Sequence, residues 1–147
     1  MLTEQEIAQI FRGKKKRTAN TKDANGSMIK TSSQGFEHTT LEQFKAWFEQ
    51  SNFEQGCKYC GTTNEQSFRL YTAARNSENA GVDWTRGGKR GRRLEIDRLN
   101  PALPYDNLSN LVWCCYWCNN AKSNFFTAEE FQPIANQIGL ALKKMLQ

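Results

Sequence analysis

Two Cys-x-x-Cys pairs constrain the fold of this chain more than any other feature. Cys57-Lys-Tyr-Cys60 and Cys115-Tyr-Trp-Cys118, which we call the first and second knuckle, are separated by 54 residues. Each knuckle turns its two sulfurs toward one point, and two knuckles complete the tetrahedral shell that zinc prefers. A closed shell of four thiolates leaves no open position, so this zinc would be structural. A redox dithiol, a disulfide framework and buried free thiols are the alternatives. We expect Cys114, the fifth cysteine, to be a small buried side chain.

The size and composition fit a small domain that needs such a metal. The chain has 147 residues and only 38% of them are hydrophobic, so its core is thin, and thin cores are commonly reinforced by a structural metal. No apolar run is long enough for a membrane span, and the first residues lack the order of a secretory signal. We therefore expect an intracellular, cytoplasmic protein, in which paired cysteines bind metal more often than they form disulfides.

The positive charge of the chain is clustered. The net charge is +5 and the pI is about 9.0, with basic blocks at residues 12–17 and 86–93. Glycine and polar neighbours indicate that both blocks are loops. Clustered lysine and arginine favour a polyanion such as nucleic acid as the partner, and an ordinary solvated basic surface is the alternative.

Hydrophobic periodicity predicts an α+β fold without internal repeats. Helices are expected over residues 3–12, where Thr3 and Glu6 form a cap, over residues 40–50, and from residues 117–120 to 124. Residues 94–99 and 110–114 suit strands. Residues 13–36 read as a loop, and residues 62–93 as irregular chain in which 68–72 is compatible with a strand. A last helix should begin at the capping box Thr127-Ala-Glu-Glu130 and bury Phe131, Ile134, Ile138, Leu142 and Met145.

The region around the second knuckle carries an ordered motif. Glu95-Ile-Asp-Arg98 is followed by Asp106-Asn-Leu-Ser-Asn-Leu111 and then by Cys115-Tyr-Trp-Cys-Asn-Asn-Ala-Lys-Ser123. This pattern resembles the HNH (ββα-metal) endonuclease family over about residues 57–131, and in particular its Asp-Arg branch, which includes rare-cutting restriction enzymes. The resemblance implies a small zinc-stapled ββα-metal core with flanking helices and long irregular loops. Residues 1–56 would form an N-terminal helical and basic region that packs on the core, and residues 57–147 the HNH nuclease core with the C-terminal helix, in one compact unit overall.

The resemblance assigns roles to individual residues. Asp97 matches the metal ligand on the first strand and Asn119 the ligand at the start of the helix, while Ser123 lies one turn later, where some members carry another ligand. Asn110 matches the central asparagine, which holds the catalytic group and the hairpin through hydrogen bonds. Because Asp97 and Asn119 offer only oxygen atoms, a single Mg²⁺ or Mn²⁺ suits this site.

Arg98 departs from the pattern, because most members carry the general-base histidine at its position. Arginine is always protonated and cannot accept a proton, but it can clamp a phosphate and stabilise transition-state charge. Two candidates for the base remain. Tyr59 is preferred, with its pKa lowered by a nearby cation, and His38, the only histidine, is the second candidate and otherwise a phosphate contact. A packing role for Tyr59 and a surface-loop position for His38 are the alternatives.

The implied activity is metal-dependent, sequence-specific cleavage of double-stranded DNA, of the restriction type, leaving 5′-phosphate and 3′-hydroxyl ends. A homodimer on a palindromic site matches the symmetry of the duplex. The alternatives are a non-catalytic zinc-dependent nucleic-acid-binding module, a nicking nuclease of a phage or mobile element, and an RNA-directed nuclease, and the chain is expected to be bacterial or phage-encoded. The expected DNA contacts are Arg86, Lys89, Arg90, Arg92, Arg93 and Lys122.

Overall fold

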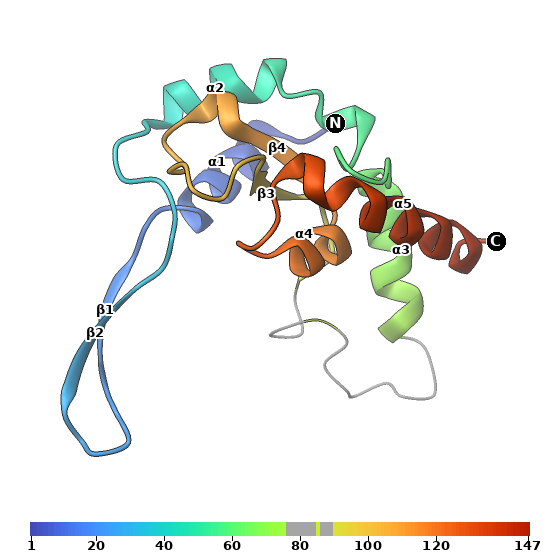
Figure 1. Ribbon diagram of the computed structural model, residues 1–147. Coiled ribbons are helices and arrows are strands. Elements are labelled where there is room, and N and C mark those ends of the chain that lie inside the picture. Colours follow the sequence, from blue (N-terminus) through green and yellow to red (C-terminus); the bar gives the residue numbers. More distant parts are fainter. Residues whose placement is uncertain (76–84, 86–89) are drawn as a thin grey trace. The chain divides into compact units, whose positions relative to one another are not determined.

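The structure is a computed structural model that describes residues 1–75, 85 and 90–147 (Figure 1). These residues divide into two units. The first contains residues 1–50 and 103–109, and the second contains residues 51–102 and 110–147. Among the described residues, no helix has the length and apolar character needed to cross a membrane.

The first unit is built on two helices and an aromatic cluster. Helix α1 spans Glu4–Gly13 and begins with the expected capping box between Thr3 and Glu6, and α2 spans Leu41–Gln50, as expected. Phe11, Phe36 and Phe44 are buried, and their ring centroids lie 5.5–5.6 Å apart. This contact joins α1 to α2 through the segment that connects them.

A β-hairpin occupies the segment that we expected to be a loop. Strand β1 (Thr18–Lys22) pairs antiparallel with β2 (Met28–Ser32). The Asp23 carboxylate accepts hydrogen bonds from the backbone N–H groups of Asn25 and Ser27, each at 2.9 Å, and Gly26 adopts the positive φ of 80° that the turn requires. The loop prediction was wrong because it relied on alternation of apolar residues, which a hairpin without a buried face does not need.

Asp106 fastens the segment that leads into α2. Its carboxylate accepts hydrogen bonds from the backbone N–H groups of Glu37, His38 and Thr39 and from the Thr39 hydroxyl, which lies 2.6 Å away. Burial raises the pKa of Asp106, but these hydrogen bonds outweigh it and lower that pKa to about 2. The carboxylate therefore stabilises this backbone turn only while it is ionised.

The second unit contains the expected ββα arrangement. Strand β3 (Glu95–Arg98) pairs antiparallel with β4 (Leu111–Cys114), and the short helix α4 (Tyr116–Lys122) follows directly. The two predicted strands, the short helix and the α+β fold class are thus confirmed. Short 3₁₀ turns at Phe53–Gln55 and Leu108–Asn110 complete the connections.

Helix α3 (Asn64–Arg75) replaces the strand that residues 68–72 were compatible with. Thr63 and Gln66 exchange side-chain to backbone hydrogen bonds of 3.0 and 3.2 Å, the pattern of a capping box. Its buried residues Ser67, Leu70 and Tyr71 recur at helical spacing. The capping pattern and this spacing were present in the sequence and identify the helix.

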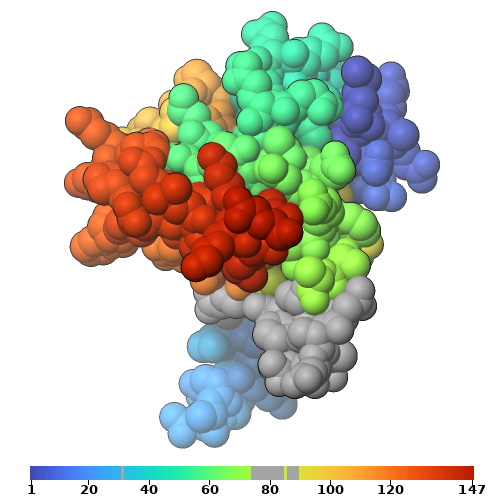
Figure 2. All heavy atoms as spheres, turned by 90° about the vertical axis from the view of Figure 1, so that its right-hand side faces the viewer, coloured from blue at the N-terminus to red at the C-terminus, as the bar shows by residue number. Residues whose placement is uncertain are grey.

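The last helix, α5 (Ala128–Met145), begins at the predicted capping box of Thr127 and Glu130. It lies alongside α3 (Figure 1 and Figure 2), where the Arg69 guanidinium donates a hydrogen bond to the Leu146 carbonyl at 3.4 Å. The predicted buried stripe was partly wrong, because Ile134 and Met145 are 39% and 69% exposed. The buried residues of α5 are Phe131, Ala135, Gly139 and Leu142.

Candidate zinc site and active site

The two knuckles bring four sulfur atoms together. The Sγ atoms of Cys57, Cys60, Cys115 and Cys118 all lie within 4.8 Å of one another, and the Cys60–Cys115 distance is 3.6 Å. Four sulfurs bound tetrahedrally at about 2.3 Å from zinc are separated by about 3.8 Å. The donor set and its spacing therefore fit a closed structural zinc site.

Hydrogen bonds among the clustered thiols shift their pKa values in both directions. Hydrogen bonds from Cys115 and Cys118 lower the pKa of Cys60 to about 7, and those from Cys114 and Cys115 lower the pKa of Cys57. The other pair responds in the opposite sense, since the hydrogen bond with Cys115 raises the pKa of Cys118. Crowded thiols thus share their protons unevenly, and a bound zinc would replace those protons on all four sulfurs.

Local backbone contacts hold the knuckles in place. The N–H of Lys58 donates to the Trp113 carbonyl at 2.8 Å, which ties the first knuckle to β4. The Cys115 Sγ caps α4 by accepting from the Cys118 N–H at 3.4 Å. Cys114 is fully buried, as expected, and its Sγ lies 4.0 Å from that of Cys57 but outside the four-sulfur cluster.

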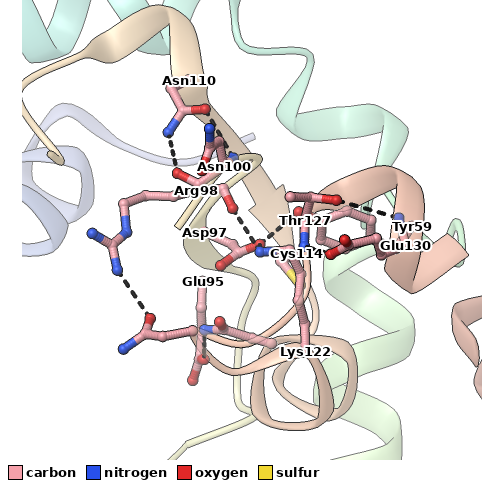
Figure 3. A network of polar contacts seen from close by, with 12 residues as sticks. Tyr59, Glu95, Asp97, Arg98, Asn100, Asn110, Cys114, Lys122, Thr127 and Glu130 are labelled. Carbon is pink, nitrogen blue, oxygen red and sulfur yellow. Dashed lines mark hydrogen bonds and ion pairs between the residues drawn. The ribbon is translucent and has the colours of Figure 1, made fainter. Parts of the chain in front are cut away.

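Asp97 lies at the centre of the candidate active site (Figure 3). It is 5% exposed, and its Oδ2 accepts a hydrogen bond of 2.6 Å from the Tyr59 hydroxyl. The same oxygen forms an ion pair of 3.1 Å with Lys122 Nζ. The first knuckle, β3 and the end of α4 therefore converge on one carboxylate.

Tyr59 is protonated in this arrangement, because its hydroxyl is the donor to Asp97. Burial and the Asp97 charge both raise the pKa of Tyr59. From the sequence we expected Tyr59 to lie beside the second knuckle and α4. The structure adds a direct hydrogen bond from Tyr59 to Asp97, the predicted metal ligand.

Lys122 differs from the expectation of a DNA contact. Its side chain is fully buried, and Nζ donates to the Arg98 carbonyl at 2.7 Å in addition to pairing with Asp97. The ammonium is therefore enclosed within the site, where no phosphate reaches it without a rearrangement. Sequence spacing alone did not reveal this, since a lysine in the last turn of a helix is usually solvated.

Arg98 is 6% exposed, and its Nη2 donates to Asn124 Oδ1 at 2.9 Å. Ser123 follows the end of α4 with a positive φ of 52° and an exposed side chain. It therefore does not continue the helical face of Asn119, as the predicted one-turn spacing assumed.

Asn110 locks the connection between the two strands. Its Oδ1 accepts from the Asn100 N–H at 3.0 Å, its Nδ2 donates to the Asn100 carbonyl at 2.9 Å, and its own carbonyl accepts from Leu99 at 2.8 Å. These bonds fix the end of β3 relative to the start of β4 (Figure 3).

Glu95 is a site residue to which sequence reasoning gave no role. Asn119 Nδ2 donates to Glu95 Oε2 at 2.8 Å, and Arg90 Nε donates to the other carboxylate oxygen at 2.9 Å. The Glu95 carboxylate also holds the pKa of Arg90 above its usual value. A residue two positions before Asp97 on a strand projects to the same face, so the alternation of β3 could have identified it.

The remaining residues predicted from the sequence as catalytic or DNA-binding are in the first unit, on the exposed surface of the second unit, or outside the described residues. His38 belongs to the first unit, where its side chain is 85% exposed and its Nε2 lies 3.8 Å from Glu37 Oε2. Arg92 and Arg93 are exposed in the second unit. Arg86 and Lys89 lie outside the described residues.

The β3–β4 hairpin, followed by a short helix with one clustered cysteine at its N-cap and another in its first turn, forms a ββα fold with a four-cysteine cluster that fits zinc. Among solved structures, the chain is similar to the rare-cutting HNH restriction endonuclease PacI, described for an extraordinary mechanism of DNA perturbation. The TM-score is 0.51 and the identity 25%, over 72% of this chain and 66% of that one. The chain thus spans slightly less than two thirds of that nuclease. No family model and no curated protein matches the chain. The predicted resemblance to an HNH endonuclease is confirmed at the level of the fold.

Proposed function

We propose that this protein is a metal-dependent endonuclease of the HNH type that cuts double-stranded DNA at a specific sequence. The observation that carries the proposal is the convergence of Tyr59, Asp97 and Lys122 beside the four-cysteine cluster. The likeness to a restriction endonuclease supports a nuclease function at the family level. Hydrolysis would leave 5′-phosphate and 3′-hydroxyl ends.

Oxygen donors support a hard divalent cation at this site. Both contacts of Asp97 use Oδ2, and the Asn119 amide donates through Nδ2, so Asp97 Oδ1 and Asn119 Oδ1 are the atoms that would hold Mg²⁺ or Mn²⁺. The Glu95 carboxylate, bound to Asn119, orients that amide. When bound, the cation polarises the phosphate and stabilises the leaving oxygen.

The protein groups divide the remaining work. Lys122 forms a buried ion pair with Asp97 and so holds that carboxylate in place, and Asn110 fixes the end of β3 relative to the start of β4. We assign Arg98 to the scissile phosphate, which its guanidinium can bind through two N–H groups as negative charge develops. This assignment requires phosphate to compete with Asn124 for the guanidinium.

Tyr59 is the proposed general base, and His38 is the proposed phosphate contact and the alternative base. Burial and the Asp97 charge raise the pKa of Tyr59 even though Lys122 is paired with Asp97, and this opposes the base role. A divalent cation held by Asp97 would add positive charge close to Tyr59, and that charge would lower the pKa of the hydroxyl.

Incubation of the protein with plasmid and genomic DNA in Mg²⁺ or Mn²⁺, followed by sequencing of the cut ends, tests the proposal. We expect one recurring sequence at the ends, and no cutting by Asp97→Ala. Tyr59→Phe should abolish cleavage and His38→Ala should weaken it. Full cleavage by Tyr59→Phe would exclude Tyr59 as the base.

A non-catalytic zinc-dependent DNA-binding module is the second candidate. The ion pair between Lys122 and Asp97 favours this candidate. Because the lysine charge already balances the carboxylate, Asp97 has less need of a catalytic cation. Specific binding with no cleavage of genomic DNA in any divalent metal would select this candidate.

Cutting both strands with one active site per chain requires two copies or sequential nicking, and we propose a homodimer that acts on a palindromic site. Exposed apolar residues of α5, Leu140 at 62% and Ile134 at 39%, offer a surface for it. Sedimentation with and without cut-site DNA measures the assembly. A restriction role would place the protein inside the cell, together with its DNA substrate.

A further inference from the structure

The strand side chains of the β1–β2 hairpin whose burial is described are all exposed. Every residue of β1 is exposed, and in β2 even the apolar Met28 and Ile29 are 63% and 43% exposed. A two-stranded hairpin with no buried face is only marginally stable in water. An exposed hairpin of this kind depends on its attachment to the rest of the first unit.

Backbone hydrogen bonds and a buried aromatic residue attach the hairpin to the first unit. Below the strands, the N–H of Ser33 donates to the Arg17 carbonyl at 2.9 Å, and Lys16 and Phe36 continue the pairing at 2.9 Å. Phe36 is 1% exposed and belongs to the aromatic cluster of the first unit. Gly35 is required at the root, since a Cβ there would collide with the Lys14 carbonyl.

The hairpin and its root carry the excess charge of the whole chain. Residues 14–33 contain six lysines and arginines and a single acidic residue, a net charge of +5. The net charge of the entire chain is also +5, so the remainder is neutral overall. The one acid, Asp23, accepts the N–H groups of its own turn. This concentration of charge matches a polyanion.

The strand register puts both strand lysines and Asn20 on one face. Asn20 lies opposite Lys30, and Lys22 lies opposite Met28, so these four residues share a face. All four are exposed. Lysine is suited to phosphate oxygens, and asparagine can bind the N6 and N7 atoms of adenine with two hydrogen bonds.

We propose that the β1–β2 hairpin enters the major groove of duplex DNA, with Lys22 and Lys30 on phosphates and Asn20 on base edges. The identity of the partner rests on the proposed function. The major groove is about 12 Å wide and admits a two-stranded ribbon. Five residues of strand extend about 17 Å, which corresponds to about five base pairs at 3.4 Å each.

Equilibrium binding of the full-length chain to a pool of random 30-base-pair duplexes, without magnesium and at several salt concentrations, tests this proposal. The double variant Lys22→Gln/Lys30→Gln should lower the slope of log K against log salt by about 2, because two phosphate contacts are lost. The matched control is Lys143→Gln/Lys144→Gln, which removes two exposed charges from α5 and should leave the slope unchanged. Equal effects of the two double variants, or no effect of the first, overturn the proposal.

The variant Asn20→Ala tests whether the hairpin contacts base edges in addition to attracting phosphate through its charge. Selection of bound duplexes from the pool should show that this variant loses preference at one or two adjacent base pairs while its salt slope stays unchanged. An unaltered preference overturns the reading role. Duplex RNA should show no dependence on Lys22 and Lys30, since its major groove is too narrow, and an equal dependence for RNA overturns groove insertion.

Cleavage is scored separately, so the two proposals can fail independently. Hairpin-dependent binding by a chain that cuts no DNA supports this inference and removes the nuclease function. Cutting that is unaffected by the hairpin variants keeps the nuclease function and overturns this inference.

Discussion

Lys122 and Asp97 form an ion pair that is almost completely shielded from water. The distance from Nζ to Oδ2 is 3.1 Å, and the two side chains are 0% and 7% exposed. The pair joins the last residue of α4 to β3, and the Tyr59 hydroxyl donates a hydrogen bond to the same carboxylate oxygen. Because both charges have lost their hydration, each depends on the other, and removing one leaves the other uncompensated.

Replacing Lys122 by methionine should therefore be strongly destabilising. We expect the free energy of unfolding to fall by about 3–5 kcal/mol, the usual cost of an unpaired buried charge. Urea unfolding of the zinc-loaded protein measures it. The exposed Lys143→Met on α5 is the control and should change stability by less than about 0.5 kcal/mol. A double variant with Asp97→Asn should lose less than the sum of the two single variants. Additive losses would contradict the pairing.

Asp106 should give the first unit a pH-dependent stability. Its pKa is lowered from 3.8 to about 2 by hydrogen bonds that only the carboxylate accepts. The stabilisation is therefore complete above the pKa of the unfolded chain, near 3.9, and is lost as the pH falls toward 2. At pH 7, Asp106→Asn should cost about 1–3 kcal/mol.

Denaturant unfolding of Asp106→Asn and of the native chain at about pH 7, 4 and 2.5 measures this dependence. The stability difference between them should shrink toward low pH. Glu49→Gln, a neutralisation at an exposed position of α2, is the control and should give a smaller difference. A difference for Asp106→Asn that stays constant with pH would mean that its ionisation is not what stabilises the turn.

The sequence predicted the parts of the fold that repeat a local pattern. The strand that carries Asp97, its partner β4 and the capping boxes at Thr3 and Thr127 each follow from residues close in sequence. The two knuckles were predicted to meet because zinc chemistry requires four thiolates at one point.

Features that depend on three-dimensional partners were not predictable in the same way. Lys122 and Glu95 are polar residues whose roles become visible only when the groups they contact are known. The strand side chains of the β1–β2 hairpin whose burial is described are exposed, so this segment carries no hydrophobic signature. In α5, the close approach to the first knuckle puts Gly139 rather than Ile134 in the buried stripe.

Gly139 should be intolerant of a side chain. A Cβ at this position would lie 3.1 Å from the Cys60 Cβ and 3.2 Å from the Cys60 carbonyl oxygen. Gly139→Val should destabilise the protein by about 1–3 kcal/mol through overpacking and weaken zinc binding by displacing Cys60. Thermal unfolding and competition with a chromogenic zinc chelator measure the two effects. Gly13→Val, with no atom within 4 Å of its Cβ, is the matched control. Equal zinc affinity in both variants would contradict the coupling of α5 to the knuckle.

Zinc binding should discriminate between two equally buried cysteines. Cys114 and Cys118 are both 0% exposed, but only Cys118 belongs to the four-sulfur cluster. We expect one zinc per native chain after dialysis, measured by mass spectrometry of the metal content. Cys118→Ser should lose it, and the loss should be accompanied by reduced helical circular dichroism, because metal binding and folding of such a site are coupled. Cys114→Ser should keep the metal even if its stability falls, since a buried sulfur is replaced by a smaller polar oxygen. Loss of zinc from Cys114→Ser and retention by Cys118→Ser would reassign the fourth ligand from Cys118 to Cys114.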